Sequence, residues 1–172
     1  MTMQNRLMKN ALKVTGITSL LRWINASSDK TKFDQQFGSI NQHEVTVGEI
    51  SLNFATEDQY SKHWFFPRYF PDLQHEPAAT ELFHLHIKPT DTVLDIGAHL
   101  GYFTCVSAAL TPQGNVHCFE MDELCIPLIE RNIELNGFRN VAVNNCGAGA
   151  KTSTEQIPDF LKPNPGLSMK GK

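Results

Sequence analysis

Residues 91–122 read DTVLDIGAHLGYFTCVSAALTPQGNVHCFEMD, and this stretch decides the fold that we expect. Residues 92–96 (TVLDI) form a short apolar run of β-formers, which suits a strand buried in a parallel sheet. Gly97 and Gly101 bracket a tight turn, and the small and apolar residues 102–110 then predict a helix packed on that sheet. The order of strand, glycine turn and helix therefore predicts an α/β fold.

The glycine turn also predicts a ligand site. The start of a helix leaves backbone N–H groups unpaired, and a turn without side chains lets a polar ligand approach them. A second short strand over residues 115–119 ends at Glu120. Ligands of doubly wound folds sit outside the carboxyl ends of the strands, where an acid about 20 residues after the turn can accept both hydroxyls of a ribose. Glu120 fits that role.

The spacing of the glycines distinguishes two kinds of cofactor. It is not the G-x-G-x-x-G of a dinucleotide-binding fold, because Asp95 ends the strand before Gly97 and three residues separate Gly97 from Gly101. That acid would repel a pyrophosphate and attract a cofactor with a cationic amino-acid end. The pattern favours S-adenosylmethionine, with its ammonium towards Asp95 and its ribose towards Glu120.

The stretch from His75 to Thr152 resembles the FkbM-type class I methyltransferases. The matching segments are HEP at 75–77, KP at 88–89, VLDIGAHLGYF at 93–103, FE at 119–120 and RNIELNG at 131–137, and NPGLS at 164–168 is similar to a further family segment. His99 stands where the family usually has Asn, and Met121 where it usually has Pro. Neither departure replaces a glycine or an acid of the pattern.

The resemblance implies a Rossmann-like class I methyltransferase fold and methyl transfer to an oxygen of a small molecule or saccharide. It also implies a parallel sheet of seven strands, of which this chain supplies the first three. We therefore expect an incomplete fold, the amino-terminal half of a methyltransferase or a truncated product. The strand over residues 92–96 then lies at a bare sheet edge, which favours self-association.

The predicted cofactor site gathers residues from several parts of the chain. Glu76 precedes a helix that Pro77 opens and is placed to reach the ammonium of the cofactor, although an acid at a helix start explains it equally well. Cys146 and Gly147 follow a third strand, residues 141–144, on a loop that passes the adenine ring in this topology. No catalytic residue and no metal ligand is assigned. The full set is Glu76, Asp95, Gly97, Ala98, His99, Gly101, Tyr102, Glu120, Met121, Cys146 and Gly147.

The residues before this unit predict smaller elements. Residues 7–24 have the spacing of an amphipathic helix, which either docks on the domain or lies on a membrane surface, and residues 25–37 read as a polar, mobile linker. Apolar residues of period two then predict a β-hairpin that turns near Gly48. The aromatic residues between 64 and 70 form either a lid over a substrate pocket or core under a loop. The resulting division is 1–37, 38–90 and 91–172.

Composition limits the class of protein. With 172 residues, 41% hydrophobic and 19% charged, the chain has the size and composition of one soluble globular domain. Its net charge of -3 argues against nucleic acid or anionic membrane as a general partner. Charged residues interrupt the amino-terminal segment too often for a signal peptide or a membrane span. Four cysteines without a C-x-x-C pair predict reduced thiols in a cytoplasmic protein.

Three classes of function stay open at this point. The glycines and acids of residues 95–120 favour a methyltransferase that uses S-adenosylmethionine. An NAD-type dinucleotide-binding protein is disfavoured, because the middle glycine of its motif is missing. A non-catalytic cofactor-binding or scaffold remnant is favoured by the absence of a second half of the sheet.

Overall fold

The computed structural model describes residues 28–152. The chain divides into two compact units, Met1–Ser39 and Ile40–Lys172. The helix expected over residues 7–24 and the family-like segment at 164–168 lie outside the described residues. The division into three segments stays a prediction.

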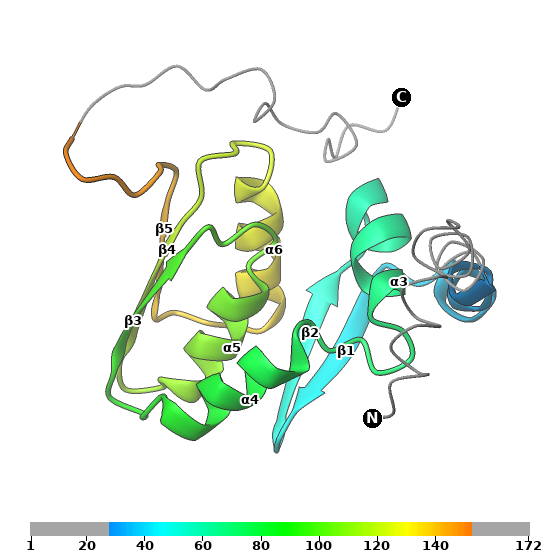
Figure 1. Cartoon of the computed structure of the whole chain (residues 1–172), viewed down its shortest axis with the longest axis horizontal. Coiled ribbons are helices and arrows are strands. Elements are labelled where there is room, and N and C mark those ends of the chain that lie inside the picture. The colour runs from blue at the N-terminus through cyan, green and yellow to red at the C-terminus, as the bar shows by residue number, and fades with distance from the viewer. Residues whose placement is uncertain (1–27, 153–172) are drawn as a thin grey trace, which may run out of the picture. The chain divides into compact units, whose positions relative to one another are not determined.

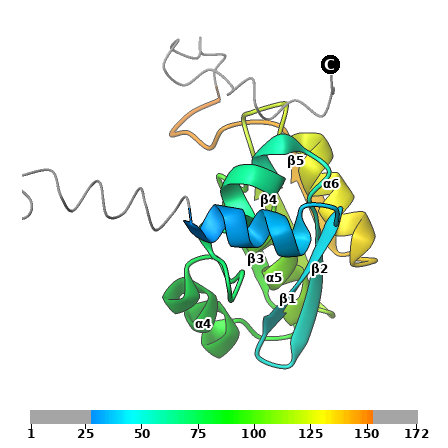
Figure 2. The same cartoon turned by 90° about the vertical axis from the view of Figure 1, so that its right-hand side faces the viewer.

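The segment that the sequence suggested as a mobile linker is instead helical over residues 28–37, so that prediction was wrong (Figure 2). Within this polar segment, side chains four residues apart contact each other. Lys30 Nζ lies 2.6 Å from Asp34 Oδ2, and the rings of Phe33 and Phe37 lie 5.1 Å apart between centroids. Such i,i+4 pairs support a helix. Gly38 N then donates to Asp34 O at 2.9 Å at the end of the helix.

The predicted hairpin is confirmed as the first element of the second unit. Strands β1 (Gln42–Val47) and β2 (Ile50–Ala55) pair antiparallel, with Val45 opposite Leu52. Gly48 has a φ of +59°, which is the left-handed conformation that a tight hairpin turn requires. Every second residue of β1 is buried, so the hairpin presents one apolar face to the rest of the unit.

The cofactor unit also has the predicted order of elements. It consists of β3 (Thr92–Ile96), α5 (Tyr102–Leu110), β4 (Asn115–Phe119), α6 (Ile126–Leu135) and β5 (Val141–Asn144), and the strands form a parallel sheet in the order β3, β4, β5. Parallel strands in this order, with helices between them, form a Rossmann-like α/β arrangement, as the sequence predicted. A separate turn precedes helix α6, in which Asp122 Oδ1 accepts from Leu124 N at 2.9 Å.

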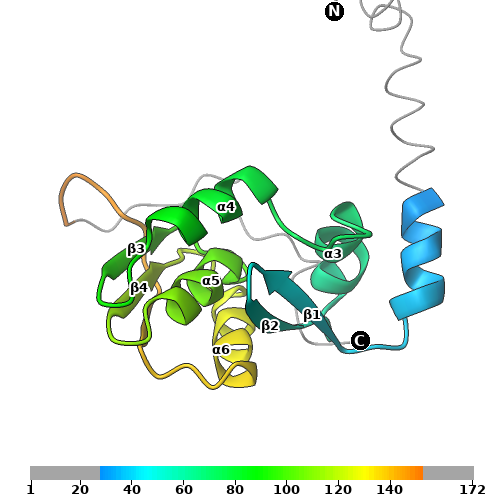
Figure 3. The same ribbon diagram turned by 90° about the horizontal axis from the view of Figure 1, so that it is seen from below.

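The second unit is layered. Helices α5 and α6 lie between the three-stranded sheet and the hairpin (Figures 1 and 3). Val116 and Cys118 of β4 are completely buried on the helix-covered face. On the opposite face of β3, Leu94 and Ile96 are 60% and 63% exposed. Within the described residues β3 is an edge strand, as the sequence predicted.

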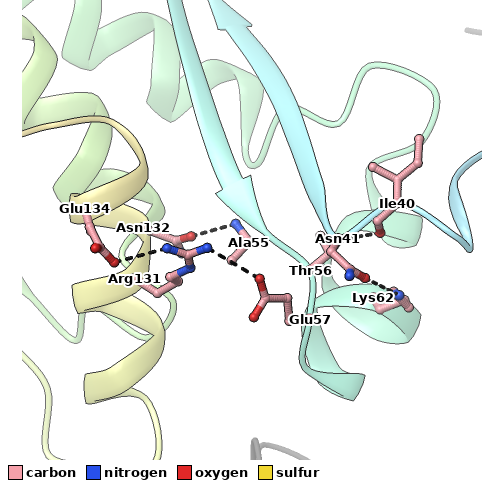
Figure 4. Close-up of polar contacts among 9 residues, drawn as sticks. All are labelled: Ile40, Asn41, Ala55, Thr56, Glu57, Lys62, Arg131, Asn132 and Glu134. Atoms are coloured by element: carbon pink, nitrogen blue, oxygen red, sulfur yellow. Dashed lines mark hydrogen bonds and ion pairs between the residues drawn. The ribbon is translucent and has the colours of Figure 1, made fainter.

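Two asparagines, one in α6 and one directly after it, join the hairpin to the cofactor unit. Asn132 Oδ1 accepts from Ala55 N at 2.8 Å, and Asn132 Nδ2 donates to Leu100 O at 2.8 Å (Figure 4 shows the first bond). One turn later, Asn136 Oδ1 accepts from Asn53 N at 2.8 Å and Asn136 Nδ2 donates to Asn53 O at 2.7 Å. These amides satisfy backbone groups of β2, as a neighbouring strand would.

The aromatic segment between the hairpin and the cofactor unit is largely core. It forms a π-helical turn, η1 (Ser61–Phe65), and a short helix, α3 (Phe66–Arg68). Phe65 and Phe66 are buried, and Phe66 packs 5.8 Å from Phe54 between ring centroids. Helix α4 (Pro77–His86) then follows, with Pro77 in its first turn as predicted.

All four cysteines are free, with Cys105, Cys118 and Cys125 buried and Cys146 exposed. Burial raises the pKa of Cys125 to about 12, with the charges of nearby acids acting in the same direction. Within residues 28–152, no helix has the length and apolar character needed to cross a membrane.

Candidate cofactor site

Glu120 is fixed at the carboxyl end of β4 by the glycine turn itself. Its Oε2 accepts from His99 N at 2.8 Å, and its Oε1 accepts from Asp122 N at 2.8 Å. The residue is 9% exposed. A carboxylate offers about four lone-pair sites. Two of them therefore remain for the hydroxyls of a ligand, while the backbone bonds hold the group in place.

The turn is open to solvent at Gly97. Gly97 has a φ of +84°, and its N–H donates to Phe119 O at 2.8 Å, which ties the turn to the end of β4. A Cβ atom at this position would meet no heavy atom within 4 Å. The space on this side is therefore available to a ligand that lies against the backbone.

Gly101 has a different environment from the one that the sequence suggested. It has a φ of +78°, but a Cβ atom there would lie 3.3 Å from Ile129 Cγ2 of α6. The absence of a side chain at Gly101 thus allows the turn to pack closely against α6. Sequence spacing grouped both glycines as cofactor contacts, because it cannot distinguish a glycine that faces a ligand from one that faces a helix.

Asp95 is turned towards the helix-covered side of the sheet. It lies opposite the buried Cys118, and its Oδ2 accepts from Thr104 Oγ1 of α5 at 2.5 Å. Burial raises the pKa of Asp95 and so does the charge of Glu120, whereas the bond from Thr104 lowers it. The carboxylate that was expected to face the ammonium of the cofactor is therefore hydrogen-bonded to α5.

His99 occupies the middle of the turn with a φ of +53°. Its ring packs edge-to-face on Tyr60 at 5.1 Å and lies 6.1 Å from the ring of Phe65. Burial lowers the pKa of His99, against the charges of Glu120 and Asp122, which raise it. The imidazole is consequently neutral at pH 7. The sequence did not predict Tyr60 at this site, because no local pattern indicates that an aromatic residue so far upstream packs on the turn.

The expected adenine side is assembled from two loops. The exposed Met121 follows Glu120, and a Cβ atom at Gly147 would lie 4.0 Å from Met121 Cβ. Asn145 Nδ2 donates to Glu120 O at 2.9 Å and so links the loop after β5 to the end of β4. Cys146 is exposed on the same loop. These predicted residues do come together.

Three other predicted residues are placed less favourably for contact with a cofactor. The ring of Tyr102 is buried and stacks on Phe54 at 5.4 Å, so only its backbone is available. Ala98 is buried beneath the turn. Glu76 is exposed and has a φ of +44°, and its Oε1 lies 3.9 Å from His75 Nε2. No contact joins Glu76 to the glycine turn among the described residues.

Asp58 was not predicted and belongs to the same neighbourhood. It is almost completely buried, and its charge raises the pKa values of both His99 and Cys125. The only sequence signal was its position three residues before Ser61, which is the spacing of a capping acid. In the described part of the chain, no cluster of three or more His, Cys, Asp or Glu side chains has the geometry to hold a metal ion.

Comparison with known proteins finds methyltransferases. No protein-family model matches the chain. Over 88 residues the chain is 32% identical to protein-L-isoaspartate O-methyltransferase 1 of Polaromonas sp., a match that covers 46% of this chain and 36% of that enzyme. The chain thus spans about a third of the length of this curated relative.

Solved structures similar to this chain have low identity. They include a SAM-dependent methyltransferase from Aquifex aeolicus, with 22% identity, a TM-score of 0.35 and coverage of 46% of this chain and 40% of that one. TYW2 of M. jannaschii in complex with AdoMet has 15% identity, a TM-score of 0.43 and coverage of 64% and 45%. Trm5b from Pyrococcus abyssi has 21% identity, a TM-score of 0.42 and coverage of 62% and 28%. None of these matches singles out the FkbM-type family.

Proposed function

We propose that this chain binds S-adenosylmethionine and acts in methyl transfer. The observation that carries the proposal is the position of Glu120, whose carboxylate is fixed by two backbone N–H groups beside the open side of Gly97. This arrangement suits the two hydroxyls of a ribose. Met121 and Gly147 lie together at the next loop, where an adenine ring would follow.

We propose an oxygen of a small molecule or saccharide as the methyl acceptor. The FkbM-type resemblance of residues 75–152 supports this acceptor class. The relative from Polaromonas is named a protein-L-isoaspartate O-methyltransferase, which also supports an oxygen acceptor and makes a carboxylate of a protein the second candidate. The buried free thiols of Cys105, Cys118 and Cys125 support a reducing, cytoplasmic location.

Binding is tested by thermal shift and calorimetric titration with S-adenosylhomocysteine and, in parallel, NAD. A ligand that binds only the folded state raises the melting temperature with concentration. We expect S-adenosylhomocysteine to do so and NAD to have no effect. Stabilisation by NAD alone would overturn the assignment, because it would place a pyrophosphate at the glycine turn.

Catalysis is tested separately with methyl-labelled S-adenosylmethionine. The acceptors are a set of saccharides and an isoaspartyl-containing peptide, so that the two acceptor classes are compared directly. Transfer of label to either one supports the proposed enzyme. Tight binding of S-adenosylhomocysteine without transfer to any acceptor would instead support the non-catalytic cofactor-binding remnant.

A further inference from the structure

Asp58 is a buried carboxylate that the predicted cofactor site does not include. It lies between β2 and η1 and is 3% exposed. Its Oδ1 accepts from Ser61 N at 2.7 Å. Its Oδ2 is also buried and has no hydrogen-bond partner among residues 28–152. Burial of a charged oxygen without a partner is costly, so this atom is suited to a ligand that supplies a donor.

Asp58 shares its surroundings with the glycine turn and the start of α6. The ring of Tyr60, two residues after Asp58, packs edge-to-face on His99 of the turn at 5.1 Å between centroids. The charge of Asp58 also raises the pKa of His99 and that of Cys125, which immediately precedes α6. Glu120 and Asp122 act on the same two groups. Arg68 is a positive charge that acts on the same imidazole in the opposite direction, so three acids are set against one guanidinium there. Such a site has a surplus of negative charge that a cationic ligand would compensate.

The other acids near the turn are already engaged by the protein. Both oxygens of Glu120 accept backbone N–H groups. Asp95 Oδ2 accepts from Thr104 Oγ1, and Asp122 Oδ1 accepts from a backbone N–H. Of these carboxylates, Asp58 is the one that keeps a fully buried oxygen without a partner.

We propose that Asp58 binds the ammonium at the amino-acid end of S-adenosylmethionine, the role that the sequence pattern assigned to Asp95. The inference rests on the proposed function. In this arrangement Glu120 binds the ribose and Asp58 binds the ammonium. The cofactor thus lies across the open side of Gly97. A residue from outside the βαβ unit thereby decides whether a ligand with an amino-acid end is preferred.

The test compares three adenosine ligands by calorimetric titration of the parent chain and of Asp58→Asn. S-adenosylhomocysteine carries both the ammonium and the carboxylate, its decarboxylated form keeps only the ammonium, and 5′-methylthioadenosine has neither. Asparagine retains the oxygen that accepts from Ser61 N. We expect Asp58→Asn to weaken the first two ligands at least about tenfold, because a charge-assisted bond is lost, and to leave 5′-methylthioadenosine unchanged.

Two further variants act as controls. Glu57→Gln removes a neighbouring acid that is exposed and pairs with Arg131 at 3.5 Å (Figure 4), and we expect it to change none of the three affinities. Glu120→Gln removes the charge of the proposed ribose partner and should weaken all three ligands. Asp58→Asn should unfold in urea at or above the midpoint of the parent, since it removes an unpaired buried charge.

Several results would overturn the role of Asp58. Equal affinities of parent and Asp58→Asn for S-adenosylhomocysteine would make Asp58 purely structural. An equal loss of affinity for all three ligands would mean that Asp58 affects the binding of adenosine or the fold itself. Failure of the parent to bind any of the probes would instead overturn the proposed function itself.

Discussion

The glycine turn between β3 and α5 has a packed side and an open side, and the two use similar residues for different purposes. On the packed side, Gly101 approaches Ile129 of α6, and Asn132 binds the carbonyl of Leu100. On the open side, Gly97 has free space and Glu120 retains unused lone pairs. Substitutions on the packed side should therefore cost stability, whereas those on the open side should cost ligand binding.

The sharpest test of this difference is the pair Gly101→Val and Gly97→Val. Both residues have left-handed φ values, +78° and +84°, which a branched side chain disfavours by about 1–2 kcal/mol. Only at Gly101 does a side chain also collide with α6, which adds about 1–3 kcal/mol of overpacking. We expect urea denaturation to show a loss of about 2–5 kcal/mol for Gly101→Val. Equal losses for both variants would mean that the turn has no packed side.

Asn132→Ala should give the next largest loss of stability. It leaves the buried Ala55 N and the carbonyl of Leu100 without their partner, and each unpaired group costs about 1–3 kcal/mol. We expect the free energy of unfolding to fall by about 2–4 kcal/mol. Asn136→Ala is the matched control, since Asn136 is only half-buried and water can replace it. A smaller loss for Asn132→Ala than for Asn136→Ala would contradict this account.

The local elements were predictable from the sequence because local signals define them. The bounds of β3, α5 and β4 agree with the apolar runs and with the glycine and proline residues between them. The environments of Gly101 and Asp58 were not predictable, because they depend on where α6 and β2 come to lie. The helix over residues 28–37 was missed for another reason, since its charged and aromatic pairs are spread through a polar segment.

The buried face of the hairpin should control the response to acid, because His43 of β1 is buried there. Burial lowers the pKa of His43 to about 4, with the charge of Lys62 acting in the same direction. The unfolded chain, with a pKa near 6.5, thus binds more protons between these two values, so stability falls as the pH falls. We expect urea denaturation to show a loss of about 2 kcal/mol between pH 7 and pH 5.

His43→Leu provides the control for this pH dependence. Leucine does not titrate, so the slope of stability against pH should become smaller. The lowered pKa values of His75 and His99 act in the same direction and should account for the slope that remains. An unchanged slope in His43→Leu would assign the pH dependence to groups other than His43.

On the open side, Glu120→Gln should reduce binding more than stability. Glutamine keeps an acceptor but loses the charge, and only one of the two backbone N–H groups keeps its oxygen. We expect the affinity for S-adenosylhomocysteine to fall about tenfold, or about 1.4 kcal/mol, by calorimetric titration. Glu120→Ala is a poorer test, because it releases both His99 N and Asp122 N. Unchanged affinity would remove Glu120 from the site.

The smallest effect on stability is expected for the exposed side chains of β3. We propose that the chain associates with itself through this strand. Leu94 and Ile96 are exposed on β3, which is an edge strand within the described residues. An unpaired apolar edge favours pairing with another chain. Light scattering should show concentration-dependent association of the parent and its loss in Leu94→Lys.

Leu85→Lys is the matched control for this last prediction. Leu85 of α4 is as exposed as Leu94 but does not lie on a strand edge. Its replacement should leave association unchanged, and both variants should unfold within about 0.5 kcal/mol of the parent, because neither side chain is buried in the folded monomer. A monodisperse parent, or equal loss of association in both variants, would contradict pairing through β3. Charge repulsion alone would explain the second result, since both substitutions add one positive charge.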